Sequence, residues 1–213
     1  NTTADNNTAV GVDALGVNTT GAQNTALGAN SLDANTTGQN NTALGMGALG
    51  NSTTSNSNTA VGLNASVGNT TGAGNVAVGQ DTLFAATVAS NNVALGKGAG
   101  VAVTTGGGNT IIGSDAGDVI TTGTHNVCIG LGTDPSGSGG VNQIVIGHNI
   151  SGGEDSQFTF GKASNIVQNE FDTDAAWTRT SDIRKKRNVN DDNLGLSFIN
   201  NLRPVTFQWK PSN

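Results

Sequence analysis

The pentapeptide "NTAVG" at residues 7–11 returns in register along most of the chain and decides its fold. The later copies are "NTALG" at 24–28, "NTALG" at 41–45, "NTAVG" at 58–62, "NVAVG" at 75–79, "NVALG" at 92–96, "NTIIG" at 109–113, "NVCIG" at 126–130 and "QIVIG" at 143–147. Every step is 17 residues, without an insertion or a deletion. A fixed period of this kind is the signature of a repeat architecture in which each copy forms one structural unit.

A 17-residue repeat is too short for a unit that contains a helix, but it is long enough for one coil of a β-solenoid. The pentapeptide reads as a short strand closed by Gly, and a "TT" pair follows about half a period later. We therefore expect an all-β fold, a parallel β-roll over residues 1–150 with two short extended pieces per coil. Coils that rise by roughly 4.8 Å, the strand spacing, give a section roughly 40 Å long.

Alternation along the pentapeptide separates two faces of the strand. The third position is Ala in six copies and then becomes Ile111, Cys128 and Val145, while the fourth is always a larger aliphatic residue. We expect the larger residues to fill the coil interior and the Ala series to form a flat face against another chain. The packing is then expected to widen or loosen toward the C-terminus, with Cys128 as a buried apolar residue and neither a nucleophile nor a metal ligand.

The polar positions of the repeat have structural explanations. We interpret the opening Asn as a ladder at a turn, whose amides bond to the backbone or to the next coil, rather than as a ligand surface. The closing Gly supplies a positive φ at the corner. The Thr array is also interpreted mainly as structure, because adjacent Thr residues point to opposite faces and the array fails at 87–88. Ice or sugar binding through the Thr array is the alternative.

Composition limits the functions that the chain can have. Of the 213 residues, 34% are hydrophobic and 4% aromatic, which is too little for a wide core, and 11% are charged, which is too little for a disordered chain. Residues 1–178 carry twelve acidic and two basic side chains, so we expect no nucleic acid as a partner. No apolar run approaches the length of a membrane span, so we expect no membrane insertion. We also expect no cofactor and no metal, with His125 and His148 as solvated or hydrogen-bonded residues rather than ion ligands.

The 17-residue period breaks after residue 150. Alternating apolar residues continue at Phe158 and Phe160, and Phe171 and Trp177 follow in a chain with few aromatics. We predict that residues 151–180 form a neck in which larger side chains close a trimer.

The body of the chain resembles a known class of repeat. Its "NTALG"-type phrases resemble the head repeats of trimeric autotransporter adhesins, and similar arrays occur in phage tail fibres. The resemblance covers roughly residues 5–150 and implies a left-handed parallel β-roll built as a homotrimer. A narrow coil favours the same arrangement, since three chains can share one core.

Two motifs near the C-terminus resemble the endosialidase-type intramolecular chaperone of phage tail fibres and tailspikes. They are "SDIRKKRN" at 181–188 and "LRPVTFQWK" at 202–210. The first follows the family pattern Ser-Asp-x-Arg-x-Lys-x-Asn and the second Leu-Arg-Pro-Val-x-Phe-x-Trp-Lys. Modules of this family run on beyond the length of 181–213, so we expect these residues to be the truncated, N-terminal part of the module.

This resemblance implies a peptidase that acts once, on itself, after the chaperone has helped three chains to wind together. Carried over to this sequence, the scissile bond is Thr180–Ser181, Ser181 is the nucleophile and Lys186 is the general base. Asp182 and Arg184 are expected to support the turn.

The residue types fit that chemistry. A Ser hydroxyl is a weak nucleophile until a base takes its proton, and a Lys amine can act as the base when desolvation lowers its pKa. The cationic neighbours Lys185 and Arg187 would lower the pKa of Lys186 further. Ser181 also suits a helix N-cap, a role compatible with the first.

These features favour a structural and receptor-binding protein, the distal shaft of a trimeric phage tail fibre, located in the virion and extracellular. Its expected partners are two further copies of itself, other tail proteins, and a host surface receptor that is a glycan or an outer-surface protein. The first alternative is the head of a trimeric bacterial surface adhesin. The second is a glycan depolymerase, which needs paired carboxylates across a groove. Glu154–Asp155 and Asp191–Asp192 are poor candidates because sequence neighbours point apart.

Overall fold

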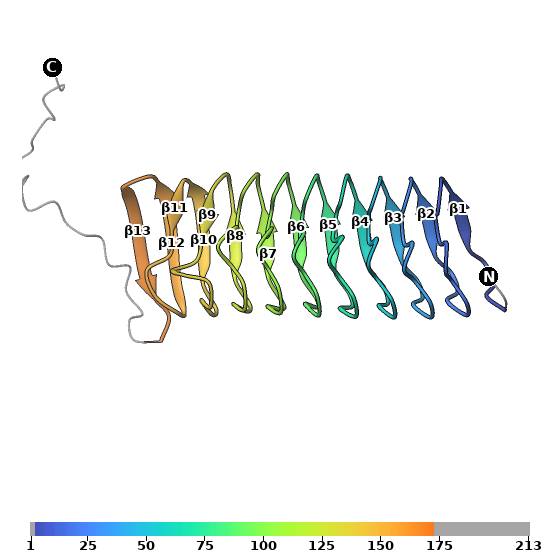
Figure 1. The fold of residues 1–213 in the computed structure, drawn as a ribbon. Coiled ribbons are helices and arrows are strands. Elements are labelled where there is room, and N and C mark those ends of the chain that lie inside the picture. Colours follow the sequence, from blue (N-terminus) through green and yellow to red (C-terminus); the bar gives the residue numbers. More distant parts are fainter. Residues whose placement is uncertain (1–2, 173–213) are drawn as a thin grey trace, which may run out of the picture. The chain divides into compact units, whose positions relative to one another are not determined.

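The structure, a computed structural model, describes residues 3–172, which form a parallel β-solenoid (Figure 1). One strand of each coil joins an eleven-stranded sheet whose order follows the sequence, β1 to β8 and then β10, β12 and β13. Neighbouring coils pair in strict 17-residue register from Thr8 opposite Thr25 through Val127 opposite Ile144. No helix occurs in the described residues. The all-β solenoid with 17-residue coils is confirmed.

The strands are short. Those of the repeat are β1 (Thr8–Val10), β2 (Thr25–Leu27), β3 (Thr42–Leu44), β4 (Thr59–Val61), β5 (Val76–Val78), β6 (Val93–Leu95), β7 (Thr110–Ile112), β8 (Val127–Ile129) and β10 (Ile144–His148). From β1 to β8, each strand occupies the middle of one pentapeptide, between the Asn that precedes it and the Gly corner that follows, whereas β10 follows Gln143 and runs through Gly147. The strand therefore covers only a small part of each coil.

The last coil departs from the period. Strand β12 (Gln157–Lys162) pairs parallel to β10 with Phe158 opposite Ile144, a step of 14 residues. Strand β13 (Asn165–Glu170) then returns antiparallel to β12 as a hairpin. A small second sheet joins β9 (Thr133–Asp134) to β11 (Ile150–Ser151). Part of the segment expected to be a neck, residues 157–170, thus continues the sheet of the repeat.

A ladder of Asn side chains fixes the register between coils. The Oδ1 atom of each Asn accepts a hydrogen bond from the backbone N–H of the equivalent residue in the next coil, at 2.8–3.0 Å. Its Nδ2 donates to a backbone carbonyl 14 residues on, at 2.6–3.0 Å. Both ends of a buried amide are satisfied in this way, as burial requires. The interpretation as a structural ladder is confirmed.

The Gly that closes each pentapeptide is required for two reasons, its backbone conformation and its close contact with the next coil. At Gly28 φ is +139°, and a Cβ there would lie 2.6 Å from the carbonyl oxygen of Gly45 in the next coil. Only Gly combines this backbone conformation with so close an approach. The expected positive φ at the corner is confirmed.

The prediction of which residues face the coil interior is wrong. The third position of the pentapeptide is fully buried from Ala26 to Val145, whereas fourth-position residues such as Val10 and Leu44 are 56% and 42% exposed. The interior is narrow, and buried Leu residues from the following turn, such as Leu32 and Leu49, already occupy it. Only a small side chain fits on the strand beside them, so the larger aliphatic residues point outward.

The packing does not loosen toward the C-terminus either. Where the third position enlarges to Ile111, the interior Leu of the turn is replaced by Gly100 and Gly117. A Cβ on Gly100 would lie 2.9 Å from Ile111 Cδ1, and one on Gly117 would lie 3.1 Å from Ile111 Cγ2. The Ile side chain therefore fills the space that Leu leaves, and Ile111, Cys128 and Val145 are all fully buried.

The "TT" element forms no second strand in the described coils. The first Thr of each pair donates from Oγ1 to a backbone carbonyl of the next coil, at 2.9–3.3 Å. This ladder continues through Thr87, where the second residue of the pair is Val88. The bonds support the structural interpretation of the Thr array.

A second, interrupted amide ladder lies inside the first coils. Asn35 donates from Nδ2 to Asn18 Oδ1 at 2.9 Å and to the Gly38 carbonyl at 3.1 Å. In the next coil Ser52 takes the equivalent place and bonds to Ser55 instead. The buried Oδ1 of Asn35 consequently has no hydrogen-bond partner. Such an orphaned acceptor costs about 1–3 kcal/mol.

The double substitution Ser52→Asn with Ser55→Gly should therefore stabilise the fold. The new amide can donate to Asn35 Oδ1, and the Gly gives it the room that Gly38 gives Asn35. We expect the free energy of unfolding to rise by about 1 kcal/mol, measured by chemical denaturation. Ser52→Asn alone should destabilise the protein, because the larger amide meets the Ser55 side chain. Equal stability of the single and double variants would contradict this account.

Candidate functional site

The residues predicted to cleave the chain lie outside the described residues 3–172. These are Thr180 and Ser181 at the scissile bond, Lys186 as base, and the supporting Asp182 and Arg184. Their roles stay predictions.

Cys128 is fully buried in the middle of β8. Burial, with a smaller contribution from the charge of Asp134, raises the pKa of its thiol to about 12. The thiolate, which is the nucleophile and the metal ligand, is therefore not populated near neutral pH. The expectation that Cys128 is a buried residue is confirmed.

A pair of carboxyl groups, Asp134 and Asp118, lies on adjacent coils. Burial, followed by the neighbouring charge of Asp118, raises the pKa of Asp134 from 3.8 to about 6. Backbone hydrogen bonds from Val119 and Asp118 oppose the shift in part. Its Oδ1 atom is buried without a hydrogen-bond partner. Asp134 is thus a carboxyl that holds its proton more tightly in the folded chain than in the unfolded one.

In the acidic pair Glu154–Asp155, Asp155 is held in the end of the Asn ladder. Asp155 Oδ1 accepts hydrogen bonds from the Val141 N–H at 2.7 Å and from Gln143 Nε2 at 3.0 Å. Gln143 occupies the place of the ladder Asn in the ninth pentapeptide, so Asp155 closes the end of the ladder. Its role is structural.

The described residues contain no group of three or more His, Cys, Asp and Glu side chains able to hold a metal ion. His125 and His148 are both exposed. Within the same residues there is no helix with the length and apolarity to cross a membrane.

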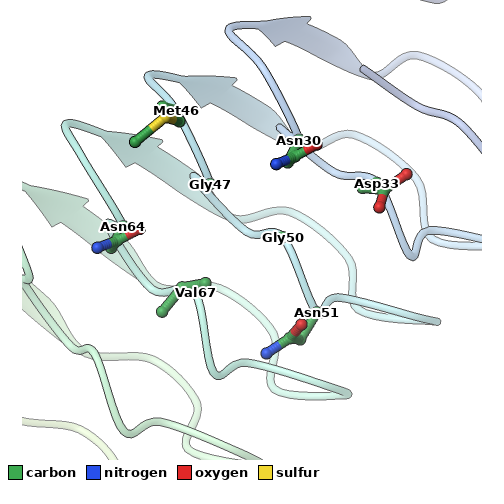
Figure 2. Close-up of a pocket in the computed structure, with 8 residues that line it drawn as sticks. All are labelled: Asn30, Asp33, Met46, Gly47, Gly50, Asn51, Asn64 and Val67. Carbon is green, nitrogen blue, oxygen red and sulfur yellow. The ribbon is translucent and has the colours of Figure 1, made fainter. Parts of the chain in front are cut away.

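A hollow of about 390 Å³ lies on the turn that follows β3 (Figure 2). It spans three successive coils and is lined by Asn30, Asp33, Met46, Gly47, Gly50, Asn51, Asn64 and Val67. Its floor is the backbone at Gly47 and Gly50, where the neighbouring coils carry Asn30 with Asp33 and Asn64 with Val67. The hollow thus exists because two side chains are missing from one coil.

A second hollow, of about 440 Å³, has the same origin at another corner. Gly107 and Gly108 lack the side chains that Ser90 and Asn91 carry in the coil before. His125 borders this hollow, with its Cδ2 atom 3.0 Å from where a Cβ of Gly108 would lie.

Sequence reasoning missed both hollows. Their signal is present in the repeat, because aligning the coils shows where Gly replaces a side chain at two nearby positions. What the alignment could not show is that positions three residues apart in the turn, such as 47 and 50, open onto the same surface.

A comparison with known families bears on the C-terminal motifs. The family described as Chaperone of endosialidase matches residues 181–213. Neither the curated proteins nor the solved structures contain a match. The resemblance of the C-terminal motifs to this chaperone family is confirmed over residues 181–213.

The raised pKa of Asp134 predicts a pH-dependent stability. Because the folded chain keeps the proton up to about pH 6, whereas the unfolded chain releases it near 3.8, stability should fall as pH rises between those values. Asp134→Asn should remove this dependence and stabilise the protein at pH 7.5 by about 1–2 kcal/mol, allowing for solvent screening. Thermal melts of both proteins from pH 4 to pH 8 test this. Parallel pH profiles would show that Asp134 titrates normally.

Proposed function

We propose that the chain is the distal shaft of a homotrimeric phage tail fibre, extracellular in the virion, which is matured by release of its C-terminal chaperone and serves in host attachment. The observation that carries the proposal is the junction of a 17-residue β-solenoid with a match to the endosialidase chaperone at 181–213. A trimeric adhesin head would share the solenoid, but this chaperone match favours the fibre.

The release step follows from the first residues of the match. Lys186 takes the proton of the Ser181 hydroxyl, whose Oγ attacks the carbonyl carbon of Thr180. The Thr180–Ser181 C–N bond breaks, the proton passes to the Ser181 nitrogen, and water hydrolyses the resulting ester. The sequence of steps is that of nucleophilic catalysis with one turnover. The solenoid takes no part as an enzyme.

The outer face of the strands suits contact between copies of the chain. The fourth-position row runs from Val10 to Ile146 and continues into Phe160, with most members 37–56% exposed. The second-position row beside it changes from Thr in the first four coils to Val76, Val93 and later Ile144. Monomeric proteins rarely expose so long an apolar strip. Two further copies of the chain would cover it, so the proposed trimer interface is the strand face and not the Ala series.

The larger side chains of the last coil extend this strip. Phe158 and Phe160 follow Ile144 and Ile146 in the two outward rows, and their rings lie 5.5 Å apart. They would close the interface at the end nearest the chaperone match. The host receptor and the other tail proteins remain proposed partners.

Self-cleavage is tested with the full-length protein and single substitutions. We expect Ser181→Ala and Lys186→Arg to abolish cleavage, since an Arg side chain stays protonated and cannot act as the base. Lys185→Arg is the matched control and should be cleaved normally. Gel mobility and the intact mass of the product, ending at Thr180, provide the measurement. Cleavage of Lys186→Arg at the normal rate would refute the assignment of the base.

The trimer is tested by placing a charge on the strand face. Leu95→Glu should convert a trimer into a monomer, because three carboxylates would be buried without partners at the interface. Val88→Glu, at a side chain 50% exposed on the Thr corner, is the matched control and should stay trimeric. Light scattering after size exclusion gives the mass. A monomeric parent protein, or a trimeric Leu95→Glu variant, would contradict the proposed interface.

A further inference from the structure

We propose that the hollow between Asn30 and Val67 is a binding site for a neutral carbohydrate. The proposal deepens the attachment role given above and rests on it, but it does not depend on chain cleavage. It begins with the geometry of the hollow, which is built by one coil of the solenoid.

The hollow is specific to one coil. The turn positions equivalent to 47 and 50 carry Asn30 with Asp33 before it and Asn64 with Val67 after it. In the coils described, only the coil of Gly47 and Gly50 has glycine at both positions. The loss of both side chains opens a depression walled by side chains of the two flanking coils and by Met46 and Asn51 of the same coil (Figure 2).

One polar atom is oriented into this depression. Asn64 donates from Nδ2 to Asp81 Oδ1 at 3.1 Å, which fixes the plane of its amide. Its Oδ1 then lies 2.8 Å from where a Cβ of Gly47 would be, within the space that the glycine leaves. The carbonyl oxygen is a preorganised acceptor for a hydroxyl group.

The remaining walls combine polar and apolar groups. The amides of Asn30 and Asn51 can donate and accept, and the carboxylate of Asp33 accepts. Val67 Cγ2 lies 3.5 Å from where a Cβ of Gly50 would be, and Met46 lies at the opposite margin (Figure 2). A pyranose ring offers the complementary pattern, with hydroxyl groups at its edge and C–H groups on its face. The volume, about 390 Å³, falls in the range of small-molecule sites.

The charges of the lining select the class of sugar. Among the eight lining residues there is no Lys, Arg or His to neutralise an anion, and Asp33 is acidic. A phosphate or a carboxylated sugar would therefore be repelled. The lining has no aromatic ring either, which disfavours a nucleobase. A neutral saccharide is the ligand class that the groups fit.

Filling the hollow provides the test. Gly47→Asn introduces the residue that both neighbouring coils carry at this turn position, where Asn30 and Asn64 adopt the same kind of positive φ, so the variant should fold. Gly132→Asn is the matched control, since Gly132 has the same kind of φ and also faces an Asn, Asn149, in the next coil. A second pair compares Met46→Ala at the margin with Leu131→Ala at the equivalent position of another coil.

The full-length protein and its four variants are tested on a printed array of neutral and sialylated oligosaccharides. We expect retention of neutral glycans alone, a loss of at least about tenfold in Gly47→Asn, and a smaller loss in Met46→Ala. The two controls should bind as the parent does. Absence of neutral glycan binding, preference for sialylated glycans, or equal binding by Gly47→Asn would each overturn the proposal. The trimer mass and cleavage, measured on the same preparations, report separately on the proposed function.

Discussion

An Asn side-chain carbonyl on each coil accepts a hydrogen bond from the backbone N–H of the next coil, 17 residues on, and so ties the repeat length to the strand spacing. Any insertion within a repeat would move the next Asn out of reach and leave a buried amide unpaired, which is costly in a narrow interior. The same stacking brings the Gly corners so close that a Cβ on Gly28 would lie 2.6 Å from the carbonyl oxygen of Gly45, which excludes a side chain there. The hydrogen bond from the Asn ladder therefore fixes the register between coils, and with it the positions of the strand and of the Gly corner in each coil.

The narrow interior determines what lies outside. Because the turn supplies a buried Leu to most of the first coils, the strand can contribute only Ala beside it, and its larger aliphatic residues face solvent in the single chain. Where the turn supplies Gly instead, the strand enlarges to Ile111. A large side chain on the turn is therefore paired with a small one on the strand, or the reverse, so the filled interior volume stays similar from coil to coil. The larger aliphatic side chains that do not fit inside lie on the outer face of the strands.

Several ionisable side chains of the solenoid lie in contacts that support the fold. In the described residues, burial raises the pKa of both the Cys128 thiol and the Asp134 carboxyl, which keeps the thiol neutral near pH 7 but leaves the carboxyl mostly ionised there. In the acidic pair Glu154–Asp155, Asp155 accepts hydrogen bonds from Val141 and Gln143. The groups suited to recognition lie instead at hollows on the turns, where glycines remove side chains without disturbing the stacked backbone.

The sequence alone determined the period, the all-β solenoid, the Asn ladder and the Gly corner, because each depends on a residue type that recurs at a fixed spacing. It also located the chaperone motif at Ser181, since that signal is a local string of residues. Only the tertiary structure decided which face of the strand is buried, because alternation defines two faces without saying which one meets the turn. The hollow at Gly47 and Gly50 likewise became apparent only when three coils were stacked. Its walls come from residues of successive coils, 17 positions apart, and it is open because Gly47 and Gly50 have no side chains.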